Sequence, residues 1–263
     1  MRTAILYICT GIYTQFFDGF YKSCEKYFLP DMDKEYFVFT DDMSLCEEDN
    51  VHLLYKQCEG FPKDSLFRFR MFLRVKEALQ KFDYIYFFNS NAEFRTEVTA
   101  AEVLPDTESG LVGADWPGKR KPLNIPMFFP YERNKKSCAY IAPYGKEYHY
   151  YMGGINGGTS AAYIKMIEEL ASDIDDDFER GIVAVVHDES HINRYFREHT
   201  PRSLTPEYCW PEEWPSDFVP KMVFRDKVKI TGYFNKGRSR SAKAQIGKLI
   251  VALKNAARWY LTI

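Results

Sequence analysis

The sequence lacks any run of about 18 apolar residues, the length that a membrane-spanning helix needs. Its first residues lead directly into a strand-like stretch and do not have the composition of a secretory signal peptide. The six cysteines are scattered, form no C-x-x-C pair and have no histidines at metal-ligand spacing. We therefore expect reduced thiols, no zinc site and a cytoplasmic location. An internal repeat and a low-complexity linker are also absent, so a second independent domain is not expected.

The net charge of −2 hides an uneven distribution along the chain. Residues 221–263 contain eleven Lys or Arg and one acid, so their net charge is about +10 and the remainder carries about −12. Within this tail, residues 241–263 place apolar side chains on one helical stripe flanked by lysines. Such a basic amphipathic helix is typical of binding to an anionic membrane surface, and the alternative is a helix docked on the body. Nucleic-acid binding is not expected, because interleaved aromatics and a recognition motif are missing.

The first ninety residues alternate between strand and helix patterns. Continuous apolar runs predict strands over 3–9, 35–40, 51–55 and 83–88. Helical spacing of apolar residues predicts helices over 16–28 and 64–81. This alternation indicates an α/β fold with a doubly wound sheet, in which ligands bind beyond the carboxyl ends of the strands.

A glycine-rich stretch follows a polar-aromatic strand predicted over 148–152. Glycines at 153, 154, 157 and 158 indicate either a double turn or a close approach of the backbone to a ligand. Thr159 then caps a helix that we expect to continue to about Asp173.

The segment 186–196 is the strongest candidate for a catalytic element. Asp188 is a suitable N-cap residue, and Ile192, Tyr195 and Phe196 share one apolar helical face. Glu189 then lies in the first turn, where the helix dipole favours the ionised carboxylate. Such a carboxylate suits attack on, or stabilisation of, a developing cation, and the alternative is a helix start with solvated acids.

Several motifs occur together in an order that resembles the family 6 glycosyltransferases, which include the histo-blood group A and B transferases and α1,3-galactosyltransferase. The matching segments span residues 3 to 230 and are Tyr36 to Thr40, Phe87 to Asn91, Tyr131-Glu132-Arg133, Ala139-Tyr140-Ile141, Tyr150 to Gly154 with Gly157-Gly158, His187 to Ser190 with Asn193 and Tyr195, and Leu204 to Tyr208. The resemblance, to a bacterial member without a transmembrane stem, implies a GT-A fold, a UDP-sugar donor and retaining α1,3 transfer to a galactoside-containing glycan. We expect one GT-A domain over 1–235 with a Rossmann-like nucleotide-binding half, followed by a basic amphipathic helix in 236–263.

The resemblance also implies roles for individual residues. Glu189 is similar to the family's catalytic glutamate, and Asp188 to the acid beside it that binds a sugar. Residues expected to bind the UDP part of the donor are Ile8, Cys9, Thr10, Tyr13, Arg68, Asn89, Ser90, Asn91, Lys227 and Lys229. Among them, Tyr13 would stack near uracil and Lys227 would reach the diphosphate.

Asn89-Ser90-Asn91 stands where animal members have Asp-x-Asp. Neutral amide oxygens do not supply the charge with which carboxylates hold a divalent cation, so we expect no metal and no other cofactor. The charge on the leaving diphosphate would then be neutralised by Lys227, Lys229, Arg225 and the Arg238/Arg240 region. The alternative is a catalytically silent module that binds a sugar nucleotide or a glycan.

Sugar specificity depends on two further sets of residues. Trp116 replaces the family's usual His in the acceptor pocket, and Val186 replaces a frequent Trp beside His187. Met152-Gly153-Gly154 corresponds to the family's donor-selecting segment. Gly154 favours UDP-GalNAc because it leaves room for an acetamido group, whereas Met152 favours UDP-Gal. We expect an α1,3-N-acetylgalactosaminyltransferase, with α1,3-galactosyl transfer as the alternative.

Overall fold

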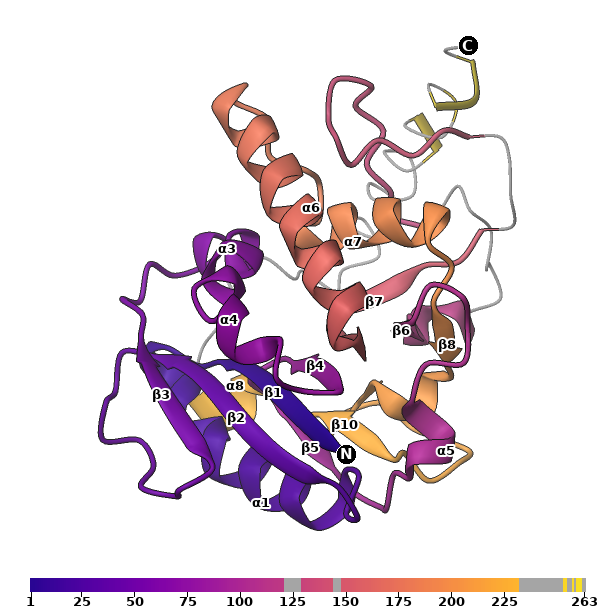
Figure 1. The fold of residues 1–263 in the computed structure, drawn as a ribbon. Coiled ribbons are helices and arrows are strands. Elements are labelled where there is room, and N and C mark those ends of the chain that lie inside the picture. The colour runs from indigo at the N-terminus through magenta and orange to yellow at the C-terminus, as the bar shows by residue number, and fades with distance from the viewer. Residues whose placement is uncertain (121–128, 144–147, 232–252, 255–256, 258, 262–263) are drawn as a thin grey trace.

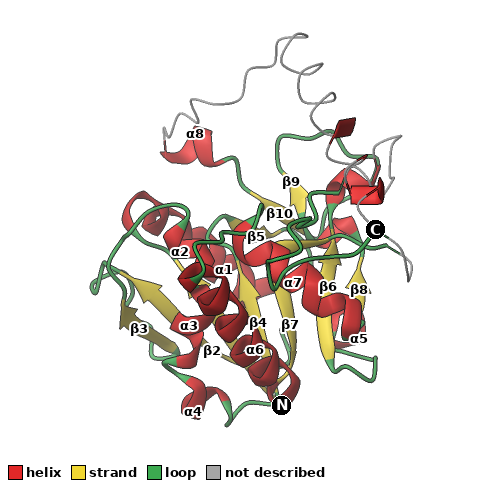
Figure 2. Cartoon of the chain, turned by 90° about the horizontal axis from the view of Figure 1, so that it is seen from above, coloured by secondary structure: helices red, strands yellow, loops and turns green. Residues whose placement is uncertain are grey.

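The computed structural model describes residues 1–120, 129–143, 148–231, 253–254, 257 and 259–261. Its main sheet has seven strands in the order β3-β2-β1-β4-β7-β6-β8, with β3 and β8 at opposite edges (Figure 2). The strands are β1 (Arg2–Ile8), β2 (Asp33–Thr40), β3 (Val51–Tyr55), β4 (Tyr84–Phe88), β6 (Leu111–Asp115), β7 (Tyr151–Thr159) and β8 (Arg202–Leu204). The first four run parallel, and β7 runs antiparallel to β4 and β6.

Helices cover both faces of this sheet (Figure 1). Alternate residues of β1 enter two different hydrophobic clusters, as expected of a strand buried on both sides. Ile5 and Tyr7 pack with α1 (Phe17–Tyr27), which follows the 3-10 helix η1 (Gly11–Phe16). Ala4 and Leu6 pack with α3 (Arg68–Leu73), α6 (Ser160–Glu179) and α7 (His187–Glu198).

A smaller sheet adjoins the ends of the central strands. It contains β5 (Ala92–Phe94), β10 (Met222–Phe224) and β9 (Trp210–Pro211), in the order β5-β10-β9. The remaining described elements are α2 (Lys63–Leu66), α4 (Lys76–Leu79), α5 (Ala100–Val103), α8 (Lys227–Thr231), η2 (Pro117–Arg120) and η4 (Pro206–Tyr208). The α/β fold class is confirmed, with a mixed sheet of GT-A type.

The four predicted strands of the first ninety residues are confirmed within two residues at each end. The single helix predicted over 64–81 is wrong, because this stretch forms the three short helices α2, α3 and α4. Thr159 does cap α6 by accepting from the backbone N–H of Ala162, but the helix continues to Glu179.

The double turn considered for the glycine-rich stretch is wrong, because all four glycines lie inside β7. At Gly157 a Cβ atom would overlap the ring of Tyr86 on the neighbouring strand. The glycine therefore allows close packing of the strands. Most of the helix predicted for the tail lies outside the described residues. Within the described part, no helix has the length and apolar character needed to cross a bilayer.

Candidate active site

A cavity of about 430 Å³ lies at the carboxyl ends of β1 and β4, and we call it the strand-end cavity. Seven of the predicted nucleotide-binding residues line it, namely Ile8, Thr10, Tyr13, Arg68, Asn89, Ser90 and Lys227. The cavity is also lined by residues that the sequence did not single out, among them Cys58, Phe61 and Asp64. Its position agrees with the general location of ligand sites in α/β sheets.

Asp64 holds together the wall formed by the turn after β1 and the loop before α2. Its carboxylate accepts hydrogen bonds from Thr10 Oγ1 (3.1 Å), Lys56 Nζ (2.6 Å) and the Gly60 N–H (3.0 Å). Burial alone would raise the pKa of Asp64, but the bonds from Lys56 and the backbone lower it below its usual value. An ionised Asp64 therefore fixes the loop against Thr10. The residue escaped the sequence analysis because its partners converge only in the fold.

Lys227 provides a cation at the cavity wall. Its Nζ lies 5.1 Å from the centroid of the Tyr13 ring, and burial lowers the pKa of the lysine. Lys229 is exposed and does not line the cavity. The Arg225 guanidinium is paired with Glu93 and with Glu212 (3.0 Å), so its expected role at the diphosphate is not supported. Arg238 and Arg240 lie outside the described residues.

The Asn89-Ser90-Asn91 segment turns at the end of β4. Asn89 and Ser90 line the cavity, and the Asn89 N–H donates to the Gly154 carbonyl of β7 (2.9 Å). Asn91 is buried, and its side-chain amide donates to the Arg225 carbonyl (2.8 Å). Cys9 is fully buried in the core. Asn91 and Cys9 are therefore buried in the protein, and neither forms part of the cavity wall.

The start of α7 differs from the sequence prediction. The helix begins at His187, which has a φ of 52°, and Val186 precedes it without a side-chain cap. Asp188 is therefore inside the first turn, and its prediction as the N-cap is wrong. Its carboxylate instead forms a buried ion pair with Arg68 (2.6 Å), whose guanidinium also lies 4.4 Å from the Phe87 ring centroid. Burial raises the pKa of Asp188, whereas the charge of Arg68 lowers it.

Two hydrogen bonds orient the Glu189 carboxylate. The Tyr150 hydroxyl donates to Oε1 (2.5 Å), and the Gly153 N–H donates to Oε2 (2.6 Å). Asn193 fixes the helix beneath it by donating to the Glu189 carbonyl (2.9 Å) while pairing with the backbone of Tyr151 on β7. Burial raises the pKa of Glu189, although both bonds to the carboxylate lower it. Because burial has the larger effect, the pKa of Glu189 lies above its usual value, whereas the helix dipole alone had predicted a favoured ionised form.

Sequence reasoning missed the roles of Tyr150 and Asn193, although both stand within the quoted motifs. Their pairing with α7 depends on β7 lying against that helix, a contact between distant parts of the chain. A signal was available in the motif itself, since a buried tyrosine hydroxyl normally requires a hydrogen-bond partner.

The residues expected to choose the donor sugar lie on β7 beside Glu189. A Cβ atom on Gly154 would lie 2.7 Å from the Phe224 ring and 3.1 Å from the Asn89 side chain. Protein atoms therefore fill the space that the sequence argument reserved for an acetamido group, and that argument for UDP-GalNAc is lost. At Gly153 the corresponding atom would meet Glu189 itself, at 3.0 Å from Cβ. Met152 is partly buried and packs against the core.

The expected acceptor residues each have contacts near the start of α7 or on Tyr150. The Trp116 ring meets the Tyr150 ring edge-on, with centroids 5.7 Å apart. His187 packs edge-on against Phe61 at the cavity rim, with centroids 4.8 Å apart. Val186 donates its N–H to Ser190 Oγ (3.0 Å). Trp116 therefore contacts the ring whose hydroxyl orients Glu189, whereas His187 lies on α7 itself and contacts the cavity residue Phe61.

Comparison with known proteins places this arrangement in a family. A model of glycosyltransferase family 6 matches residues 3–231. The chain belongs to glycosyltransferase family 6. This family 6 member is 36% identical over 233 residues to the O-antigen biosynthesis glycosyltransferase WbnI of Escherichia coli. The aligned region covers 88% of the chain and 97% of WbnI.

Two vertebrate relatives are longer than the chain. The globoside α-1,3-N-acetylgalactosaminyltransferase 1 of Gallus gallus is 32% identical over 218 residues, covering 78% of the chain and 60% of that protein. The histo-blood group ABO system transferase 2 of Rattus norvegicus is 31% identical over 227 residues, covering 78% of the chain and 63% of that protein. As a family 6 enzyme, the protein is a retaining hexosyltransferase that uses a nucleotide-sugar donor and a glycan acceptor.

Proposed function

We propose that the protein transfers N-acetylgalactosamine from UDP-GalNAc to a galactoside-containing glycan, with α1,3 linkage and without a divalent metal. The observation that carries the proposal is the Glu189 carboxylate, which Tyr150 and Gly153 orient at the start of α7, next to Asp188, the ion-pair partner of the cavity residue Arg68. An anionic group near the anomeric carbon serves a retaining transfer, and the oriented carboxylate of Glu189 would supply it.

The donor would bind with its nucleotide in the strand-end cavity. Tyr13 would stack near uracil beside Thr10, and Lys227 would contact the diphosphate. One charge-assisted contact there contributes on the order of 1.5–3 kcal/mol. Arg68 lines the cavity and pairs with Asp188, so the two together connect the donor to the start of α7.

Glu189 would act on the sugar, and two mechanisms use it differently. In a double displacement the carboxylate attacks the anomeric carbon and UDP leaves with inversion. The acceptor oxygen then displaces the carboxylate with a second inversion, and its proton passes to the UDP diphosphate. In a front-face reaction the carboxylate only stabilises the oxocarbenium-like transition state. Both need the ionised form, which burial of Glu189 opposes and its two hydrogen bonds favour.

The side chains available as metal ligands at the end of β4 support a reaction without a metal. Asn89, Ser90 and Asn91 offer no carboxylate, and Asn91 is turned into the protein to bond the Arg225 carbonyl. Hard divalent cations prefer charged oxygen ligands, so this segment suits them poorly. Lys227 would supply the charge that neutralises the leaving diphosphate.

The choice of UDP-GalNAc over UDP-Gal is supported by relatives. Three relatives match the chain at 28–32% identity and are named globoside α-1,3-N-acetylgalactosaminyltransferase 1. They come from Gallus gallus, Mus musculus and Homo sapiens. Gly154 no longer contributes to this choice. UDP-Gal remains the alternative donor, and a silent binding module is the alternative from another functional class.

We also propose that the protein works in the cytoplasm, at the inner membrane face, through the basic residues of 241–263. Replacing Lys243, Lys248 and Lys254 with Gln should weaken binding to anionic liposomes by roughly 100-fold, at about 1 kcal/mol for each charge. Neutral liposomes serve as the control, and equal binding of the two proteins to anionic vesicles would reject this location.

The decisive experiment measures UDP release from UDP-GalNAc and UDP-Gal in EDTA, with a panel of galactoside acceptors. Wild-type protein should turn over one donor without added metal, and Glu189→Gln should abolish turnover while UDP binding is retained. Glu198→Gln, an exposed change at the other end of α7, is the matched control and should be active. UDP binding without any turnover by wild type would instead support the silent module, and an absolute requirement for manganese would reject the metal-independent reaction.

A further inference from the structure

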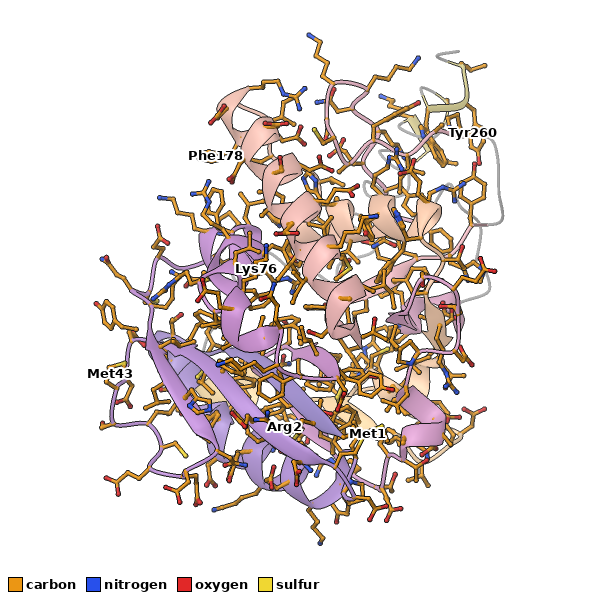
Figure 3. The ribbon with its side chains drawn as sticks, viewed as in Figure 1. Met1, Arg2, Met43, Lys76, Phe178 and Tyr260 are labelled. Carbon is orange, nitrogen blue, oxygen red and sulfur yellow. The ribbon has the colours of Figure 1, made fainter. Side chains whose placement is uncertain are left out.

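Trp259 belongs to the C-terminal segment, beyond residues 3–231 that match the family. Its side chain is nevertheless only 3% exposed, and its indole N–H donates to the Ile141 carbonyl (2.8 Å). The next residue, Tyr260, lies in the part of the molecule that carries α7, far from Met43 beside β3 (Figure 3). The end of the chain is therefore anchored on the body of the enzyme through Trp259.

The ring of Trp259 packs into an aromatic cluster that also contains Phe129, Tyr131, Ile141 and Tyr150. Its centroid lies 6.2 Å from that of Tyr131, and the Arg133 guanidinium lies 4.8 Å from the indole ring. Aromatic contacts of this kind contribute beyond the apolar area that they bury. Trp259 therefore fixes the segment that bears Tyr131.

The same cluster reaches the catalytic element. The Tyr131 ring packs on the Tyr150 ring, with centroids 5.6 Å apart. Tyr150 in turn donates a hydrogen bond from its hydroxyl to Glu189 and meets the Trp116 ring edge-on. The path from Trp259 to the carboxylate thus passes through two packed rings and one hydrogen bond.

A second path runs through Glu132, which is next to Tyr131 and buried. Its carboxylate accepts from the Val185 N–H (2.8 Å), just before α7 begins. The Glu132 carbonyl accepts from the N–H of Ile141, the residue that also receives the indole N–H. The segment held by Trp259 therefore contacts both the hydroxyl that orients Glu189 and the backbone that starts its helix.

We propose that Trp259 is a positioning residue for Glu189, so that a segment outside the family's common region completes the catalytic alignment. The inference rests on the proposed catalytic role of Glu189. A small displacement of a reacting group is enough to lower the rate strongly, so removal of the ring should act on kcat. The nucleotide should bind as before, since none of the five cluster residues lines the strand-end cavity as described.

The test compares Trp259→Ala with Trp259→Phe in the full chain, with UDP-hexose hydrolysis and transfer to a galactoside as readouts. The alanine variant should lose roughly 10- to 100-fold in kcat, with an unchanged donor KM and unchanged UDP affinity by calorimetry. The phenylalanine variant keeps a ring in the cluster and should recover most of the rate. Leu261→Ala, at a side chain that is 81% exposed, should behave as wild type.

A stability control separates positioning from general weakening of the fold. Leu170→Ala removes a side chain that is 1% exposed in the core of α6, far along the chain from the cluster. If it lowers the thermal midpoint as much as Trp259→Ala but keeps kcat below the transition, the positioning role is supported. Equal loss of kcat in both variants, or an unchanged kcat in Trp259→Ala, overturns the inference. A wild-type protein without turnover on any donor would overturn the proposed function first.

Discussion

Replacing Arg68 with Met should destabilise the enzyme far more than an ordinary arginine substitution. Arg68 and Asp188 are paired at 2.6 Å with side chains only 4% and 6% exposed. The methionine fills much of the space but leaves Asp188 as a buried acid without its partner. Breaking such a pair from one side costs about 3–5 kcal/mol, which corresponds to a fall in Tm of roughly 6–20 °C for a protein of this size.

The loss should depend on pH in a defined direction. Burial raises the pKa of Asp188 in the folded protein, and Arg68 opposes this rise. Without Arg68 the folded-state pKa rises further above its unfolded value. Such a group adds stability that is fully present below the unfolded pKa, near 4, and is lost as pH rises through the folded pKa. The variant should therefore lie closest to wild type in acid and furthest from it at neutral pH.

Urea unfolding at several pH values measures this prediction. Arg70→Met is the matched control, because Arg70 lies on the same helix and its pair with Asp175 is exposed, so its loss should cost about 0–1 kcal/mol. In the double variant Arg68→Met/Asp188→Asn, which has no buried charge at this position, part of the stability should return. The reasoning is refuted if Arg68→Met costs no more than Arg70→Met, or if its cost does not change with pH.

Two further predictions concern the site. Tyr150→Phe should lower kcat by about tenfold or more, which is the value of a hydrogen bond to a charged group. It should also move the acid limb of the pH–rate profile to higher pH, because this bond lowers the pKa of Glu189. An acid limb at the wild-type position would contradict the prediction. Lys227→Gln should weaken UDP binding by roughly 10- to 100-fold in calorimetry at pH 7. Lys229→Gln changes an exposed lysine and is the control. Equal UDP affinities of the two variants would show that the cation at 227 does not bind the diphosphate.

Apolar runs and their spacing were sufficient to predict the first four strands of the main sheet. The strand β3 was predicted with its exact bounds, because a short run between polar turns has few alternative structures. The helix over 64–81 failed for the opposite reason. Its apolar period continues across Phe67 and Val75, yet neither residue adopts helical dihedral angles there. Tertiary packing determines the backbone conformation at these two positions, and the spacing of apolar residues carries no information about that packing.

At the site, residue types were predicted better than their contacts. Thr10, Tyr13 and Lys227, which strand ends and motif order identified as nucleotide-binding candidates, all line one cavity. Asn91 was assigned to the same cavity but is turned toward the Arg225 carbonyl. Gly154 was interpreted as free space, although the Phe224 ring occupies it. Both errors concern contacts between residues that are far apart in the chain, which no local pattern encodes.

The reversal of strand direction between β4 and β7 also has an evolutionary consequence. On one side of this junction lie the parallel strands whose ends line the strand-end cavity, and on the other lie the elements that carry Trp116 and Glu189. The junction is joined by main-chain hydrogen bonds such as that between Asn89 and Gly154, which do not depend on side-chain identity. Mutations beyond the junction can therefore change the surroundings of Glu189 while the strand ends that line the cavity stay intact.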